Sequence, residues 1–219
     1  MVAVTRYAFF DLDNTLVDQN RALQEWAEHF VADRRIDPAA VDYLAVKSST
    51  ATTWTEYAEG FKRHFQLPDS VEQLVRDVTE TYPRYFMLED AVANGLRQLR
   101  TEGWLLAIIT NGATAMQNAK IDHVGLRHLV DGVFVSETEG VRKPDRAIFQ
   151  RAADHLRVEL NRRTGWMVGD SLDADIAGGI AAGLRTIWLP GGRELRVADP
   201  QPDNLCNSVA DAIKLLAGL

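Results

Sequence analysis

The sequence predicts an α/β protein with a doubly wound parallel sheet and an inserted all-helical segment. Three observations lead to this fold class. Short apolar runs recur along the chain, helical patterns with one apolar face alternate with them, and one long stretch near the N-terminus contains helical patterns throughout. Strands that alternate with helices form a parallel sheet that is covered by helices on both faces.

Five apolar runs have the length and composition of strands that are buried on both faces. The first run ends directly at Asp11. Gly103 and Gly183 each precede one of the later runs, and glycine takes the left-handed conformation that ends a helix without steric cost. The expected strands are Tyr7 to Phe10, Leu105 to Ile109, Val133 to Val135, Trp166 to Val168 and Thr186 to Leu189.

Residues 17–88 differ from the rest of the chain because they contain no buried-strand pattern. Leu23, Trp26 and Phe30 share one helical face, and Ser70 is a typical N-cap for a later apolar helix. We therefore expect a core domain of residues 1–16 and 89–219 and a helical cap domain of residues 17–88. The insertion follows the first strand directly, so we expect it near the carboxyl end of that strand, where ligands bind in open α/β sheets.

Charge and composition exclude several function classes. Lys and Arg total 24 against 31 Asp and Glu, and this net charge of -7 argues against a nucleic acid polymer as partner, since such binding needs a basic face. The apolar runs are far shorter than the roughly 20 residues that span a bilayer, and the N-terminus has no signal-peptide pattern, so we expect no membrane partner. The single cysteine, Cys206, can form no internal disulfide. We expect a cytoplasmic protein that is a monomer or a weak homodimer.

Two acidic residues, Asp11 and Asp13, follow the first strand. Side chains two residues apart in an extended segment lie on the same side of it. Paired carboxylates at a strand tip are costly unless a cation neutralises them, and hard oxygen ligands suit magnesium. An exposed acidic turn is the alternative for an isolated Asp-x-Asp pattern, but the strand before it and the motifs after it favour a metal site.

Two further motifs contain groups that could bind phosphate. Thr110-Asn111-Gly112 ends a strand just before an expected helix, where a hydroxyl and free backbone N–H groups are available. Lys143 precedes Pro144, just before a helix that Asp145 could cap. Taken alone, Thr110-Asn111-Gly112 is more typical of a turn and helix cap, and Lys143 is more typical of a surface lysine.

A second acidic group follows the Trp166 to Val168 strand. Gly169 allows a close backbone turn where Asp170 leaves the strand, and a glycine-rich helix comes next. We expect Asp173 to be solvated. Asp170 and Asp175 are the candidates for function.

The four motifs resemble the signatures of the haloacid dehalogenase superfamily. They are Phe-Asp-Leu-Asp-Asn-Thr-Leu, Ile-Thr-Asn-Gly, Val-Arg-Lys-Pro-Asp and Val-Gly-Asp-Ser-(x)3-Asp-Ile, in this order and each at a strand end. The resemblance covers residues 7 to about 190. It implies a Rossmann-like core, and the helical insertion resembles the small helical (C1-type) cap of that superfamily.

The resemblance implies a role for each matching residue. Asp11 would be the nucleophile that becomes a phosphoaspartate, and Asp13 would protonate the leaving oxygen and then activate water. The side chains of Asp11 and Asp170 and the backbone carbonyl of Asp13 would hold Mg²⁺. Phosphate would be bound by Thr110, the Asn111 backbone and Lys143, and Lys143 would also be a catalytic residue. Asp175 and Ser171 would support the metal or Lys143.

The implied activity is hydrolysis of a small phosphorylated metabolite by a phosphatase. A phosphomutase of the β-phosphoglucomutase type uses the same signatures and stays an alternative. A haloacid dehalogenase is less favoured, since it needs neither the acid Asp13 nor the metal ligand Asp170. A non-catalytic binding module is disfavoured because Asp11, Asp13, Lys143 and Asp170 are all present. Substrate choice is expected from the cap, where the candidates are Trp54, Tyr57, Lys62, Arg63 and His64. Trp54 and Tyr57 are more typical of cap core, and Lys62, Arg63 and His64 of a solvated helical face, than of substrate contact.

Overall fold

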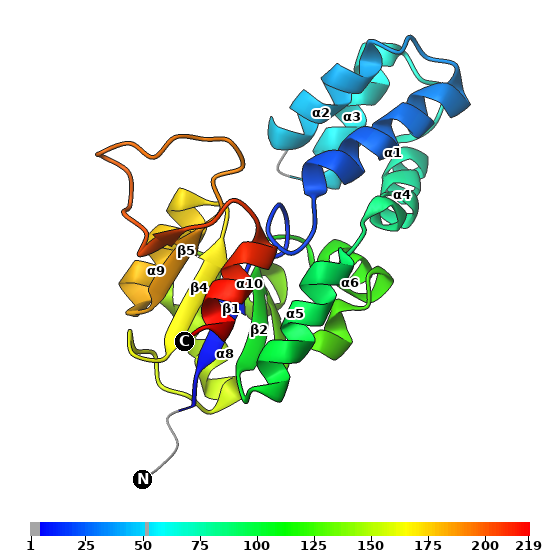
Figure 1. Ribbon diagram of the computed structural model, residues 1–219. Coiled ribbons are helices and arrows are strands. Elements are labelled where there is room, and N and C mark those ends of the chain that lie inside the picture. Colours follow the sequence, from blue (N-terminus) through cyan, green and yellow to red (C-terminus); the bar gives the residue numbers. More distant parts are fainter. Residues whose placement is uncertain (1–4, 51–52) are drawn as a thin grey trace. The chain divides into compact units, whose positions relative to one another are not determined.

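The computed structural model describes residues 5–50 and 53–219. The chain divides into two compact units, one made of Met1–Val17 and Leu88–Leu219 and the other of Asp18–Met87 (Figure 1). Residues 1–4 lie outside the described residues. The N-terminus, for which the sequence shows no signal-peptide pattern, is therefore described only from residue 5 onward. Within the described residues, no helix is long and apolar enough to cross a membrane.

The larger unit is built on a parallel sheet, which has six strands within the described residues, in the order β3-β2-β1-β4-β5-β6. The α/β class and the parallel sheet predicted from the sequence are therefore confirmed. The sequence does not predict β6, because its two residues form no apolar run. The strands are β1 (Tyr7–Phe10), β2 (Leu105–Thr110), β3 (Gly132–Val135), β4 (Gly165–Gly169), β5 (Arg185–Trp188) and β6 (Asn204–Leu205).

Helices cover both faces of this sheet (Figure 1). Gly95 in α5 approaches Ile213 in α10 so closely that an added Cβ would lie 2.6 Å from the Cγ2 atom of Ile213. On the other face, α8 and α9 pack over a cluster that includes Tyr7, Phe9 and Phe149. The helices of this unit are α5 (Asp90–Thr101), α6 (Thr114–His123), η2 (Leu126–Leu129), α7 (Ser136–Glu139), α8 (Arg146–Leu156), the π-helical turn η3 (Leu172–Ile176), α9 (Ala177–Ala182) and α10 (Val209–Ala217).

The smaller unit is helical throughout its described residues, as the sequence predicts. Trp26, Phe30 and Phe61 are buried together, and the indole nitrogen of Trp26 donates to the hydroxyl of Thr81 at 2.9 Å. Its role as a cap stays a prediction. The elements are α1 (Gln19–Arg34), α2 (Ala40–Thr50), α3 (Trp54–Phe65), α4 (Val71–Thr81) and η1 (Tyr82–Tyr85).

Several candidates for substrate contact have structural partners inside the smaller unit. The buried Tyr57 donates its hydroxyl to the carbonyl of Leu44 at 3.2 Å. The ammonium group of Lys62 donates to the carbonyls of Leu67 and Asp69, beyond the end of α3. The contact of Tyr57 supports the alternative that it belongs to the core of this unit. The contacts of Lys62 connect the end of α3 to the segment that follows it, which differs from the solvated helical face that the sequence offers as the alternative.

The position of β1 decides where a ligand can bind. Its neighbours are β2 and β4, so the order of strands along the sheet reverses at β1. In open α/β sheets, ligands bind in the crevice that such a reversal leaves at the carboxyl ends of the strands. The register pairs Phe10 with Ile108 on one side and with Val168 on the other, so the residues that follow these three strands meet at one edge.

The packing of α5 against the sheet yields a stability prediction. Leu96 in α5 is completely buried, so Leu96→Ala should lower the free energy of unfolding by about 2–5 kcal/mol through lost burial and a cavity. Urea denaturation measures this loss. Gln98→Ala, at an exposed position of the same helix, is the control and should change stability by less than about 0.5 kcal/mol. Equal losses in both variants would contradict this packing.

Candidate active site

Polar side chains gather at the edge of the sheet where β1, β2 and β4 end. Asp11 follows β1, Thr110 is the last residue of β2, and Asp170 follows β4. The backbone N–H of Asp11 donates to the carbonyl of Val168 at 2.9 Å, which ties the first of these residues to the neighbouring strand. Lys143 comes from the loop between α7 and α8. The structure thus brings together residues that lie more than 150 positions apart in sequence.

Lys143 joins two of the acidic residues. Its ammonium group donates to Oδ1 of Asp11 at 2.6 Å and to Oδ1 of Asp175 at 2.7 Å. The loop that carries Lys143 is held by the side chain of Asn111, which accepts from the Lys143 N–H at 2.9 Å and donates to the Lys143 carbonyl at 3.0 Å. The sequence indicates only the backbone of Asn111 as a functional group, whereas the structure shows that its side chain fixes the position of Lys143.

Asp11 and Lys143 are both buried, and burial is the largest single influence on the pKa of each. Burial raises the pKa of Asp11 to about 8; the charge of Lys143 opposes this rise and the charge of Asp175 adds to it. Burial alone would lower the pKa of Lys143, but Asp11 and Asp175 together raise it above its ordinary value. A charged Lys143 is therefore the stable state of this site, and additional positive charge beside Asp11 would favour the ionised carboxylate.

Three carboxylates form a candidate metal site. Oxygen atoms of Asp11, Asp170 and Asp175 all lie within 4.8 Å of one another. The set fits a hard divalent cation, because such ions prefer carboxylate oxygens. Asp175 already accepts from Lys143 through Oδ1 and from the Ser171 N–H through Oδ2, the latter at 2.9 Å, which suits a supporting role. The predicted contribution of the Asp13 backbone carbonyl stays a prediction.

Asp170 has a partner that sequence reasoning did not identify. Arg193, from the loop after β5, donates to Oδ2 of Asp170 at 3.1 Å and to its carbonyl at 2.6 Å. Burial raises the pKa of Asp170 to about 6; the charge of Asp175 adds to this rise and the charge of Arg193 opposes it. No motif marks Arg193, because the Pro190-Gly191-Gly192 turn that places it is typical of any loop.

Gly169 is required for a different reason from the one the sequence suggests. A Cβ at this position would lie 2.2 Å from Oδ2 of Asp175. The requirement for glycine therefore comes from the space that Asp175 occupies. Ser171 helps to place the same carboxylate, since its hydroxyl also accepts from the Ala174 N–H at 3.1 Å and so caps η3.

Asp13 contacts two buried residues of α6 that the sequence analysis does not predict. Lys120 donates to both carboxylate oxygens, at 2.8 and 3.0 Å. Gln117 donates to Oδ2 of Asp13 at 2.8 Å and to the hydroxyl of Thr110 at 2.7 Å. One feature of the sequence could have indicated them: Gln117 and Lys120 lie on the same helical face as Met116 and Ile121, and this face of α6 is buried.

The start of α6 offers fewer free donors than the sequence suggests. The Gly112 N–H donates to the hydroxyl of Ser136 at 3.0 Å, and the Thr114 N–H donates to the carboxylate of Glu137 at 2.7 Å. These two backbone groups are therefore engaged within the protein. Phosphate binding by the Thr110 side chain and by the Asn111 backbone stays a prediction.

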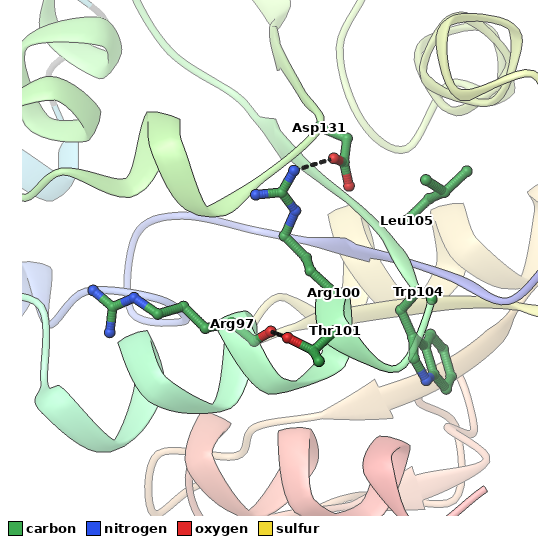
Figure 2. A pocket seen from close by; sticks show the side chains of 7 residues that line it. Arg97, Arg100, Thr101, Trp104, Leu105 and Asp131 are labelled. Carbon is green, nitrogen blue, oxygen red and sulfur yellow. Dashed lines mark hydrogen bonds and ion pairs between the residues drawn. The ribbon is translucent and has the colours of Figure 1, made fainter.

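A surface cavity of about 500 Å³ lies away from the acidic cluster. It is lined by the end of α5, by the start of β2 and by Asp131 (Figure 2). Leu105, which lines it, pairs with Tyr7 at the amino end of β1, so this cavity lies at the opposite edge of the sheet from Asp11. Arg100 forms an ion pair with Asp131 there at 2.7 Å, and Trp104 points away from that pair.

Comparison with known proteins gives matches over most of the chain. Residues 5–183 match the haloacid dehalogenase-like hydrolase family. A glyceraldehyde 3-phosphate phosphatase of Methanopyrus kandleri is 33% identical over 211 residues, covering 89% of each chain. The N-acylneuraminate-9-phosphatase of Mus musculus is 29% identical over 237 residues, covering 98% of this chain and 94% of the relative.

A solved structure shows the same fold. L-2-haloacid dehalogenase from Xanthobacter autotrophicus matches with a TM-score of 0.75 and 16% identity, covering 99% of this chain and all of the other. A dehalogenase and this chain therefore share one architecture. The fold by itself does not distinguish a dehalogenase from a phosphatase.

The raised pKa of Asp11 yields a pH prediction for the metal-free protein. Between pH 3.8 and about pH 8 the folded state binds more protons at Asp11 than the unfolded state does. The contribution of Asp11 to the free energy of unfolding therefore falls as pH rises. In a chelating buffer, the free energy of unfolding of the wild type relative to Asp11→Asn should fall across this window, by at most about 1.4 kcal/mol per pH unit. Urea denaturation at several pH values measures the difference, with the exposed Asp173→Asn as control. A constant or rising difference would show that Asp11 is not titrating in this way.

Proposed function

Since the chain belongs to the haloacid dehalogenase-like hydrolase family, we propose that it is a magnesium-dependent phosphatase that hydrolyses a small-molecule phosphate monoester through Asp11. The chain is an enzyme of a hydrolase family. The observation that carries the proposed chemistry is the buried Lys143, which bridges Asp11 and Asp175 beside Asp170. The phosphatase activity is supported by the named activities of relatives that match 84% or more of this chain.

The first step transfers the phosphoryl group to Asp11. Oδ1 of Asp11 accepts from Lys143, so we assign the attack on phosphorus to Oδ2. The new Oδ2–P bond forms while the bond from phosphorus to the substrate's ester oxygen breaks. The ester oxygen takes a proton from the carboxyl group of Asp13 and leaves as an alcohol.

The second step hydrolyses the resulting acyl phosphate. The carboxylate of Asp13 takes a proton from a water molecule, whose oxygen attacks phosphorus. The Oδ2–P bond breaks, inorganic phosphate leaves, and both aspartates return to their starting states. Using one residue as acid and then as base conserves protons over the whole cycle.

Stabilisation of the phosphoryl charge is the main task of the remaining residues. Lys143 places a buried positive charge next to the attacking carboxylate. The hydroxyl of Thr110 and the backbone N–H of Asn111 would donate to phosphoryl oxygens. Mg²⁺, held by the Asp11 and Asp170 carboxylates and by the Asp13 carbonyl, would neutralise further negative charge on the transferring group.

The other activities considered from the sequence have less support. A dehalogenase has no use for a leaving-group acid at Asp13 or for a metal ligand at Asp170. A phosphomutase would use the same residues, and its products distinguish it from a phosphatase. A binding module on this fold would be expected to have lost at least one of Asp11, Asp13, Lys143 and Asp170, and all four are present.

We propose a cytoplasmic location. The single cysteine, Cys206, is a free and buried thiol, and reduced thiols are typical of that compartment. We propose a small phosphorylated metabolite as the partner, since the relatives named as phosphatases act on such compounds.

Phosphate release tests the proposed function. The purified protein should release inorganic phosphate from p-nitrophenyl phosphate and from members of a metabolite phosphate panel, and EDTA should abolish this release until excess Mg²⁺ is added. Asp11→Ala should lower kcat by at least about 1000-fold, as expected for loss of a nucleophile. Asp173→Ala, an exposed acidic residue near the site, is the matched control and should keep normal activity.

Other outcomes point to other functions. Conversion of a phosphosugar to its isomer without stoichiometric phosphate release would show a mutase. Halide release from a haloacid would show a dehalogenase. Full activity of Asp11→Asn, in a preparation checked for deamidation, would rule out the covalent route.

A further inference from the structure

We propose that Gln117 and Lys120, on α6, are positioning residues that hold the proton-transferring carboxylate of Asp13 and the phosphate-binding hydroxyl of Thr110 in one network. This inference rests on the proposed function of the site. Both residues lie outside the four sequence motifs. Spacing of three residues places their side chains on the same face of a helix.

Lys120 fixes the plane of the Asp13 carboxylate. Its ammonium group lies 2.8 Å from Oδ1 and 3.0 Å from Oδ2, so it contacts both oxygens. The side chain of Lys120 is 3% exposed, whereas that of Asp13 is 18% exposed. A buried ammonium group is costly unless it is paired. The lysine is therefore the fixed partner, and the aspartate is the partner that still reaches solvent.

Gln117 joins Asp13 to Thr110 through one amide group. A side-chain amide nitrogen carries two hydrogens, and here the nitrogen lies 2.8 Å from Asp13 Oδ2 and 2.7 Å from the Thr110 hydroxyl oxygen. In its ionised state, which takes the proton from water in the second step, the Asp13 carboxylate can only accept hydrogen bonds, so it then requires the nitrogen of the amide to face it. Thr110 consequently accepts from Gln117 and keeps its own hydroxyl hydrogen for another acceptor. In the proposed reaction that acceptor is a phosphoryl oxygen.

The position of Gln117 is built into the second sequence motif. Its side chain is buried, and a Cβ at Gly112 would lie 2.9 Å from both Cγ and Cδ of Gln117. Gly112 therefore provides the space in which the amide sits. This observation is independent of the hydrogen bonds and explains why a glycine follows Thr110 and Asn111.

Leaving-group dependence tests whether Lys120 acts through Asp13. An alkyl phosphate needs protonation of its leaving oxygen, whereas p-nitrophenyl phosphate has a stable leaving group and needs it much less. Lys120→Met should therefore lower kcat/KM by about 10- to 100-fold for an alkyl phosphate that the wild type hydrolyses, and by less than about threefold for p-nitrophenyl phosphate. Lys120→Arg keeps the ion pair and should recover most of the lost activity.

The inhibition constant of inorganic phosphate tests the hydrogen bond from Gln117 to Thr110. Gln117→Leu removes both donated hydrogen bonds while keeping a similar volume. It should show the same preferential loss with the alkyl phosphate and, in addition, a higher inhibition constant for inorganic phosphate. Lys214→Met, an exposed lysine in α10 with 76% side-chain exposure, is the matched control and should change neither quantity.

A double-mutant cycle separates positioning from general damage. In an Asp13→Asn background, Lys120→Met should cause no further loss with the alkyl phosphate, because the residue through which it acts is already gone. Equal losses with both substrates, or an additional loss in the Asp13→Asn background, would overturn the positioning role while leaving the phosphatase proposal intact. If Lys120→Met does not fold, Gln117→Leu decides the same question by the same substrate comparison. Absence of phosphate release from the wild type would overturn the proposed function and this inference with it.

Discussion

The buried ion pairs of Lys143 are the interaction on which the rest of the site depends. The carboxylates of Asp11, Asp170 and Asp175 lie close together and repel each other, and the low polarity around them strengthens that repulsion. Lys143 is 2% exposed at its side chain and bonds Asp11 and Asp175 at once, so it offsets much of this cost. Loss of one partner would leave a buried charge uncompensated. This explains why the fold uses other residues, among them Asn111 and Gly169, to keep Lys143 and Asp175 in place.

The parallel sheet makes such a concentration of charge possible. Its central strand, β1, pairs with β2 and β4, and the shared register brings the ends of all three strands to one level. The apolar side chains of β1 are completely buried, so the polar groups begin only where the strand ends. The change from apolar to polar composition at Asp11 therefore marks the point where the strand ends and the candidate site begins.

Much of this arrangement can be predicted from the sequence, and the limit has a physical cause. Buried parallel strands are continuous apolar runs, so β1 and β4 and the acidic residues after them can be recognised from local pattern alone. Lys120 and Arg193 cannot be recognised in this way, because a helical lysine and a loop arginine are ordinary surface residues until tertiary contacts bury or pair them. Gly169 shows the same limit: its position is predictable, but its reason is a side chain six residues further along the chain.

Two neighbouring aspartates receive separate cationic partners, and this separation matters for the proposed chemistry. Asp11 pairs with Lys143 from the α7–α8 loop, whereas Asp13 pairs with Lys120 from α6. Two carboxylates can perform different tasks only if their environments differ. The Asp11 side chain is 9% exposed and lies in the acidic cluster, while Asp13 is twice as exposed and lies outside that cluster. A nucleophile needs a fixed position, and a proton carrier needs access to the leaving group and to water, so the difference in surroundings matches the difference in proposed roles.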